Sequence, residues 1–440
     1  MANRCIAAGC LFCILLLFTF EECTAANIKQ PKQLSKRLLK LEEKLIQRSR
    51  QTEERIYRSG AVYNDPELNE YLDSIVQKVL PADFKDDKID IKVKIIRDPT
   101  VNAFALPTGT VYLHTGLLAR IENEAQLAFI LGHELSHIVN KDGVYATKSL
   151  HSKAVTTKLC DLVIAPAAVF FGILGDLVRS GFGLLYVSSV TGYSKEQESR
   201  ADRESVAFAV KAGYSAEEGP KIIDILMDER KRYKNASEIY FLMSHPSNKT
   251  RRKIIAGVIE EQYKNRTGDL VNRETYFRHI TFLKSYNASL NIKMERFRHA
   301  LDNVESVLAV RPDDAEAHFY AGEIYRKMAS DRRSLKFELS KKEWKRITSD
   351  KKKEEQIAEW RKKSLAEYKR ALDGDPGYSA PNRGIGLLYM DMGEYDKALD
   401  SFNRYLKLNA GAKDRRYVKS LIKTVNDRMK ERIGKGTKGR

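Results

Sequence analysis

The feature that most constrains this chain is a pair of histidines, His133 and His137, in a segment that has the signals of a helix. Residues four apart project from the same face of an α-helix, so the two imidazoles can offer nitrogens to one metal ion. Asn123 is expected to cap the start of this helix, with Gln126 three residues later, and Gly143 follows its expected last turn. The spacing therefore predicts a metal site built on one helix.

The carboxylates near this pair are of the kind that zinc chemistry requires. Glu134 lies one step round the helix, near enough to hold a water at the metal without being a ligand itself. Zinc lowers the pKa of such a water and polarises a carbonyl, while the carboxylate takes and returns the proton. An open zinc site needs a third protein ligand, and the best candidate is Glu198, on a second predicted helix capped by Ser194 and Gln197. Asp202, one turn later, can accept an N–H from a ligand imidazole and fix its tautomer.

Two alternatives compete with this interpretation. His-Glu-x-x-His is short enough to occur by accident on any amphipathic helix, but the second helix, with Glu-Ser-Arg-Ala-Asp at 198–202, favours the metal. Thiol chemistry at Cys160 is also conceivable, yet its apolar neighbours Leu159 and Leu162 predict a buried side chain. The sequence therefore predicts a zinc hydrolase site with one zinc ion per chain.

The first 26 residues have the order of a secretory signal. Arg4 precedes an apolar run from Ile6 to Phe20, and the small residues Thr24 to Ala26 follow. An uncleaved anchor is the alternative, but the run is shorter than the roughly 20 residues that a spanning helix needs. Four of the five cysteines lie in this segment, so the mature fold must rest on a core or a metal rather than on disulfides. We expect an exported protein.

The charge balance narrows the choice of partners only slightly. The chain has 77 Lys+Arg against 59 Asp+Glu, a formal net charge of +18, which favours anionic surfaces as neighbours. Charge alone would also allow a nucleic-acid role. Since an export signal contradicts that role, we expect no nucleic-acid partner.

Helical and strand patterns surround the metal-binding segment. Residues from Gln33 to Arg58 carry leucines at helical spacing among many charges, which predicts an exposed amphipathic helix. Ile89 to Ile96 alternates with the period of a half-buried strand, and Thr110 to His114 is a second short strand after a turn. The most apolar segment, Val155 to Val190, predicts either a core hairpin or a loop that dips into a membrane or covers a cleft.

Beyond about residue 270 the sequence becomes helical and repetitive. Gly386 and Phe402 fall at offsets of the tetratricopeptide pattern, and Gly322 begins the same pattern upstream. A lysine-rich insertion of roughly thirty residues, expected to be a solvated helix face, displaces its second half. The further matches are Tyr325, Tyr389, Ala398, Tyr368, Ala371 and Pro376, with Ala300 and Pro312 in an earlier half-repeat. Chance similarity is the alternative to two recognisable repeats and one degenerate one.

These patterns predict an α+β metal-binding domain followed by an all-α repeat domain. The expected parts are a signal peptide (1–26), an amphipathic helix (27–60), the metal-binding domain (61–265) with an apolar hairpin insertion (155–190), helical repeats (270–430) and a basic tail (431–440).

Five motifs together resemble the M-forty-eight family of zinc peptidases, over roughly Asp65 to Glu260. They are Asn102-Ala-Phe-Ala-Leu-Pro107, Thr115-Gly-Leu-Leu118, Asn123-Glu-Ala-Gln126, His133-Glu-Leu-Ser-His137 and Glu198-Ser-Arg-Ala-Asp202. The resemblance implies a mainly helical zincin-type (gluzincin) domain with a small sheet, in which His133, His137 and Glu198 bind zinc. It also implies that Glu134 is the general base and that Asp202 lies behind a ligand. With its signal and repeats the chain is most similar to the periplasmic BepA-like branch, which implies a soluble periplasmic enzyme.

The family also has a His-Pro motif with an arginine six residues after the histidine, matched here by His245, Pro246 and Arg251. By itself His245 is equally compatible with an ordinary surface histidine, whereas the resemblance implies that it lies in the active site. We expect His245 to close the resting site as a fourth ligand, with Arg251 holding its loop or stabilising the oxyanion. Many members of the family have glycine at the position of Thr108, so the resemblance does not determine the conformation of this turn.

The expected function is a zinc metalloendopeptidase that cleaves internal bonds of unfolded or misassembled cell-envelope proteins. An extended substrate would add to the strand from Thr110 to His114. The repeats would bind clients or an outer-membrane assembly complex, and 155–190 would contact a membrane or cover the cleft. The alternative is a repeat-based chaperone or adaptor with a latent zinc site, although a purely structural site has no need of Glu134.

Overall fold

The computed structural model describes residues 35–152, 193–232, 248–264, 268–331, 341–347 and 349–437. The expected signal peptide, the segment from Val155 to Val190 with Cys160, and His245 with Pro246 lie outside the described residues. The elements before the repeats are α2 (Lys36–Arg58), β1 (Val62–Tyr63), α3 (Pro66–Val79), β2 (Lys92–Ile96), β3 (Ala103–Ala105), β4 (Thr110–His114), α4 (Thr115–Arg120), α5 (Glu124–Val139), α6 (Asp142–Ser152), α10 (Lys195–Lys211), α11 (Glu218–Arg232), α13 (Asn248–Val258) and the π-helix η3 (Ile259–Tyr263). Those that follow are α14 (Arg273–Lys293), α15 (Phe297–Leu308), α16 (Ala315–Ser330), α18 (Lys341–Arg346), α19 (Asp350–Gly374), α20 (Ala380–Met392), α21 (Tyr395–Leu408) and α22 (Arg415–Thr437).

A four-stranded sheet in the order β1-β2-β4-β3 forms the centre of the first domain. β2 and β4 pair in parallel, with Val93 opposite Val111, and each outer strand is antiparallel to its neighbour. The strand predicted at Thr110 to His114 is confirmed as β4. The alternating segment that begins at Ile89 is a strand only from Lys92 onward.

Contrary to our expectation, β4 cannot receive a substrate as an added strand. Both of its edges are already hydrogen-bonded, to β2 on one side and to β3 on the other. The edge of the sheet next to β4 is β3, where Phe104 pairs with Tyr112 of β4 and the strand packs against α5. An added strand would therefore have to pair with β3 or, at the far side of the sheet, with the two-residue strand β1.

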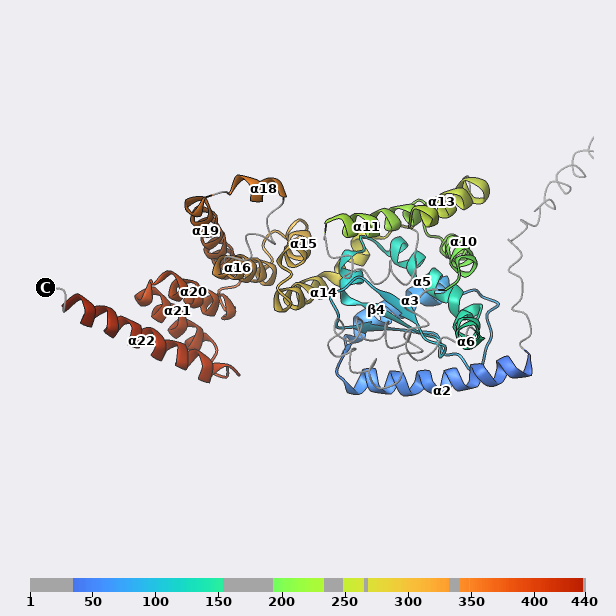
Figure 1. The fold of residues 1–440 in the computed structure, drawn as a ribbon, viewed down its shortest axis with the longest axis horizontal. Coiled ribbons are helices and arrows are strands. Elements are labelled where there is room, and N and C mark those ends of the chain that lie inside the picture. The colour runs from blue at the N-terminus through green and yellow to red at the C-terminus, as the bar shows by residue number, and fades with distance from the viewer. Residues whose placement is uncertain are drawn as a thin grey trace, which may run out of the picture.

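Helix α5 runs through the middle of the domain, and every one of its residues is buried. It packs against α10, α11, α3 and the sheet (Figure 1). Gly132 allows α10 to approach closely, because a Cβ at that position would lie 3.2 Å from the Cα of Ser205. The polar side chains of such a helix point into the interior, where each of them needs a partner.

The predicted helix starts are confirmed. The side chain of Asn123 accepts a hydrogen bond from the backbone N–H of Gln126, at 2.9 Å. At the start of α10, Ser194 and Gln197 form a reciprocal capping box. These local interactions satisfy N–H groups that have no partner within the helix, which is why the sequence pattern predicts them.

The predicted end of α5 is wrong. We expected Gly143 to follow its last turn, but α5 ends at Val139 and Gly143 lies inside α6. The chain turns instead at Lys141, whose φ of 54° lies in the left-handed region. That conformation is unfavourable for lysine, and its ion pairs with Glu42 and Asp86 help to hold it.

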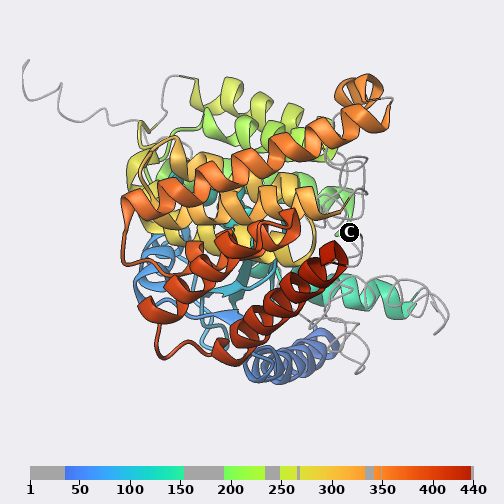
Figure 2. The same ribbon diagram turned by 90° about the vertical axis from the view of Figure 1, so that its left-hand side faces the viewer.

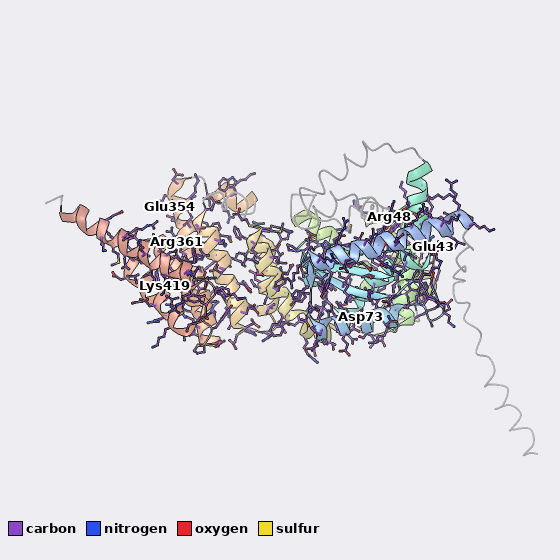
Figure 3. The ribbon with its side chains drawn as sticks, turned by 90° about the horizontal axis from the view of Figure 1, so that it is seen from below. Glu43, Arg48, Asp73, Glu354, Arg361 and Lys419 are labelled. Atoms are coloured by element: carbon purple, nitrogen blue, oxygen red, sulfur yellow. The ribbon has the colours of Figure 1, made fainter. Side chains whose placement is uncertain are left out.

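Helix α2 crosses one face of the domain, as Figure 3 shows from below. The predicted amphipathic character is confirmed, because Leu45 is buried against Val144 of α6 while Arg48 is exposed. Thr108, the departure from glycine noted in the sequence, donates from its hydroxyl to Glu53 of α2 at 2.5 Å. The side chain that replaces glycine therefore ties α2 to the turn before β4.

Helix α14 joins the two parts of the chain and lies between them in Figure 1. Its first half places Tyr276, Ile280 and Leu283 in the core of the sheet domain. Its second half places Ala288 and Ile292 in the first core of the helical region. The two regions are therefore continuous through one shared helix.

The helices beyond α14 pack in pairs, α14 with α15, α16 with α19 and α20 with α21 (Figure 2). The glycines of the predicted repeat pattern lie where these helices touch. A Cβ on Gly322 would lie 2.5 Å from the ring of Tyr368, and one on Gly386 would lie 2.6 Å from the ring of Phe402. The pattern thus marks close contacts within each repeat.

The described parts of the charged insertion and of the C-terminal segment are both helical. Lys351 and Lys352 are exposed on α19, as expected for a solvated helix face. α22 extends to Thr437, so most of the segment expected to be a basic tail is helix. Across the ranges that the structure describes, no helix has both the length and the apolar character needed to cross a bilayer.

Candidate metal centre

Helices α5 and α10 bring three metal-binding side chains together. Nε2 of His133 lies 3.2 Å from Nε2 of His137. The carboxylate oxygens of Glu198 lie 3.5 Å from the first nitrogen and 3.6 Å from the second. All three side chains are buried, and within the described parts of the chain this is the one such group whose ligand atoms converge.

The spacing of these donors fits a zinc ion. Zinc binds imidazole nitrogen and carboxylate oxygen at about 2.0 to 2.2 Å in a tetrahedron, which places neighbouring donor atoms about 3.3 to 3.6 Å apart. The three observed separations, 3.2, 3.5 and 3.6 Å, agree with that edge. Two imidazoles and one carboxylate, with one tetrahedral position left over, are also a donor set typical of hydrolytic zinc sites.

Asp202 and Arg251 lie behind His133. Nδ1 of His133 is 3.2 Å from Oδ1 of Asp202, which also accepts a hydrogen bond from Nη2 of Arg251 at 2.7 Å. Arg251 itself comes within 3.2 Å of the same Nδ1, and since both groups are donors, they share the Asp202 oxygen rather than bond each other. Burial raises the pKa of Asp202, but Arg251 and His133 bring it down to about 2, so this carboxylate is ionised.

The pKa of His133 reflects the same contacts. Burial and the Arg251 guanidinium lower it, but hydrogen bonds to Asp202 and Glu198 outweigh both and raise it to about 9. His133 therefore carries a positive charge between two carboxylates. A metal cation can replace the proton on Nε2, while the proton on Nδ1 stays with Asp202.

His137 has a corresponding carboxylate partner that our sequence reasoning missed. Oδ2 of Asp142 lies 2.7 Å from Nδ1 of His137. The same aspartate accepts hydrogen bonds from Gln197 at 2.9 Å and from Arg200 at 2.5 Å, both on α10. Burial lowers the pKa of His137 despite Asp142, so its imidazole is neutral, the form that binds metal. The acidic residue five positions after the second histidine is the signal that was available.

Glu134 and Tyr193 border the cluster. Glu134 follows His133 on α5 and is 1% exposed. The ring of Tyr193 stacks on His137, with ring centroids 3.8 Å apart and planes 26° apart. Burial, followed by the charge of Glu134, raises the pKa of Tyr193, so its hydroxyl stays neutral. Tyr193, which we did not single out from the sequence, covers one side of a ligand imidazole.

The structure therefore brings together five of the seven predicted site residues, namely His133, Glu134, His137, Glu198 and Asp202. Arg251 joins them, but on the Nδ1 side of His133, away from the converging ligand atoms. The two roles expected for Arg251, holding the loop of His245 or stabilising the oxyanion, stay predictions. His245 lies outside the described residues.

Two known families match parts of this chain. The sequence profile of peptidase family M48 matches residues 66–258, a segment that holds every described residue of the cluster. Residues 66–258 belong to peptidase family M48. A tetratricopeptide repeat profile matches residues 288–327, which confirms a tetratricopeptide repeat beside this M48 domain. The predicted repeat with Gly386 and Phe402 lies beyond the matched residues.

Named relatives resemble the M48 domain. The beta-barrel assembly-enhancing protease of Escherichia coli (strain K12) is 26% identical over 199 residues, which are 44% of this chain and 39% of the relative. A Vibrio cholerae protein whose name contains the same words is 31% identical over 195 residues, 42% of this chain and 38% of its own length. The mitochondrial metalloendopeptidase OMA1 of Arabidopsis thaliana is 27% identical over 175 residues, 39% of this chain and 33% of its own.

These alignments span well under two thirds of each relative's length. The likeness is therefore one of domains, not of whole proteins. A solved structure of a monomeric IFIT1 mutant covers 81% of this chain and 78% of its own, with 12% identity and a TM-score of 0.24, too low to indicate a shared fold.

Proposed function

We propose that this chain is a zinc-dependent endopeptidase, with one zinc ion held by His133, His137 and Glu198. The observation that carries the proposal is the convergence of these three buried donors beside Glu134, inside an M48 domain. Structural zinc sites are usually closed by four protein ligands. Three protein ligands leave a position for water or substrate, and a neighbouring carboxylate then has a catalytic use.

The chain's own residues supply positioning and proton transfer. When bound, zinc supplies a Lewis acid that lowers the pKa of a water and polarises the carbonyl of the scissile bond. Glu134 takes the proton of that water and returns it to the leaving amine. Asp202 and Asp142 each hold one imidazole by Nδ1, so that Nε2 faces the site.

The substrate lies extended along β3 in this proposal. β3 packs against α5, so a peptide paired with its outer edge passes the histidines of that helix. Main-chain hydrogen bonds of this kind recognise an extended backbone rather than a sequence, and only unfolded segments can adopt the required conformation. Folded proteins are thereby excluded without a strict sequence preference.

The clients and the compartment are also part of the proposal. The signal-like start and the bacterial relatives named as beta-barrel assembly-enhancing proteases support a periplasmic enzyme that acts on unfolded or misassembled envelope proteins. The repeats would bind clients or an outer-membrane assembly complex. We assign peripheral membrane contact or cleft cover to 155–190, and closure of the resting site to His245, on the sequence patterns alone.

The test is metal analysis of the purified protein together with casein cleavage, with and without a chelator. Stoichiometric zinc and activity that chelation abolishes support the proposal. A protein that retains zinc and leaves casein intact, alone and with its repeats removed, would favour the repeat-based adaptor.

A further inference from the structure

A small, partly open hollow with a volume of about 30 Å³ lies beside His137, between α2, α5, α6 and β3. Ala105 of β3 and His137 of α5 both contribute to its wall. A peptide paired with the outer edge of β3, as proposed above, would therefore pass close to this hollow. The residues that line the hollow include Glu42, Ala105, Leu106, His137, Ile138 and Lys141.

Most of this wall is apolar, but one end is charged. Glu42 of α2 is 3% exposed, and its Oε1 pairs with Nζ of Lys141 at 2.6 Å. Nζ of Lys141 also lies 2.9 Å from Oδ2 of Asp86. Two carboxylates thus share one ammonium group, so these three groups together carry a net negative charge.

The second carboxylate oxygen of Glu42 has no hydrogen-bond partner within the described residues, although it is buried. A buried anionic acceptor without a donor from the protein is costly. A ligand that brings a hydrogen-bond donor, and above all a cationic one, would satisfy it. The apolar wall in front of it suits an aliphatic stem.

We propose that this hollow is a substrate side-chain pocket that selects lysine or arginine, with Glu42 as the residue that determines the preference. The inference rests on the proposed peptidase function and adds a substrate class to it. An extended chain on β3 would insert a single side chain here, its methylenes along Leu106 and Ile138 and its cationic end at Glu42. If Glu42 served only to fix α2 to Lys141, no preference for lysine or arginine in the substrate would be expected.

The experiment uses the whole protein and a set of peptides that share one unstructured sequence. In each pair of peptides a single position near the cleaved bond is lysine in one and norleucine in the other, and successive pairs test successive positions. Norleucine keeps the aliphatic stem and lacks the ammonium group. At one position we expect kcat/KM to be about tenfold higher for lysine, since sites built around a polar contact reject analogues that lack it. Glu42→Gln should bring that ratio close to one. Glu43→Gln, an exposed neighbour on α2, should keep the wild-type ratio.

A second variant changes the ratio in the opposite direction. Lys141→Asn removes the ammonium group that competes for Glu42, and asparagine tolerates the left-handed backbone at this position. The lysine preference should rise above that of the wild type, which a merely damaged protein would not produce. The proposal is overturned if the wild-type ratio of kcat/KM for lysine to that for norleucine is near one at every position. It is also overturned if Glu42→Gln and the wild type give the same ratio.

A measurement of peptide binding tests the pocket proposal independently of the peptidase proposal. Fluorescence anisotropy of labelled lysine and norleucine peptides on the Glu134→Gln protein reports the pocket without any cleavage. Suppose that the wild type cleaves neither peptide, that the Glu134→Gln protein binds the lysine peptide more tightly, and that adding Glu42→Gln removes this difference in affinity. The pocket proposal is then supported, and the peptidase proposal is rejected. Cleavage without discrimination, or equal binding, leaves the peptidase proposal intact and rejects the pocket.

Discussion

Nδ1 of His137 lies 2.7 Å from Oδ2 of Asp142, a residue only five positions later in the chain. The contact exists because Lys141, in the left-handed conformation, ends α5 and reverses the chain into α6. Asp142 then anchors α10 as well, through Gln197 and Arg200. The turn therefore couples the orientation of a ligand imidazole to the helix that carries Glu198.

Asp142→Ala should weaken zinc binding by about 10 to 100-fold, because partners of this kind hold the ligand in its tautomer and orientation. The measurement is a competition titration with a chromophoric chelator on the metal-free protein. Asp90→Asn, on an exposed residue that pairs with Lys92, is the matched control and should bind zinc as the wild type does. Unchanged affinity in Asp142→Ala would show that the Asp142 contact is dispensable.

Glu134→Gln should retain stoichiometric zinc and lose proteolysis, because it removes the base while leaving all three ligands. Metal content by atomic emission and the rate of casein cleavage give the two readings. Cleavage near the wild-type rate would exclude Glu134 as the base.

Glu198→Ala should lose zinc itself. With two imidazoles remaining, the site has too few protein donors for tight binding. Zinc retained after gel filtration in the presence of a weak chelator would mean that another residue is the third ligand. Glu204→Ala is a control from the same helix, since Glu204 hydrogen-bonds Ser136 and Asn140 rather than the ligands.

Lys284 should make the stability of the junction between the two regions depend on pH. Its ammonium donates to the carbonyl of Ala119 at 2.9 Å and to Ser306 at 3.2 Å, and burial, with help from Arg120, lowers its pKa from 10.5 to about 8. Between those values the unfolded chain binds more protons than the folded one, so this residue's contribution to stability rises with pH. Below about pH 8 both states are protonated, and the contribution is at its lowest.

The measurement is the melting temperature of the wild type and of Lys284→Met at pH 7.5 and 9.5. The melting temperature of the wild type minus that of Lys284→Met should increase with pH, because methionine does not titrate. The buried tyrosines affect both proteins equally. Lys369→Met, at an exposed position on α19, should show the same pH dependence as the wild type. A difference in melting temperature that stays constant or decreases as the pH rises would contradict the lowered pKa of Lys284.

Removing the repeats should abolish cleavage of physiological clients and preserve cleavage of casein. The chain must end after α14, at Lys293, because Tyr276, Ile280 and Leu283 of that helix belong to the core of the M48 domain. A chain that ends near Glu260 would expose this core and lose stability. Client cleavage in cells by the shorter protein at the wild-type rate would exclude the repeats as the docking region.

Sequence alone determined the features that depend on local spacing. His133 and His137 share a helix face because they are four residues apart, and the caps at Asn123 and Ser194 are hydrogen bonds across three residues. Glu198 and Asp202 share a helix face for the same reason, and Gly322 and Gly386 carry the repeat pattern. Only the packing of α10 on α5 brings Glu198 to the two histidines. Tertiary structure decided what depends on distant packing. It made β3 rather than β4 the edge, put Arg251 behind His133, and placed α14 in two cores. Such contacts follow from the filling of a shared interior, and no single segment encodes them.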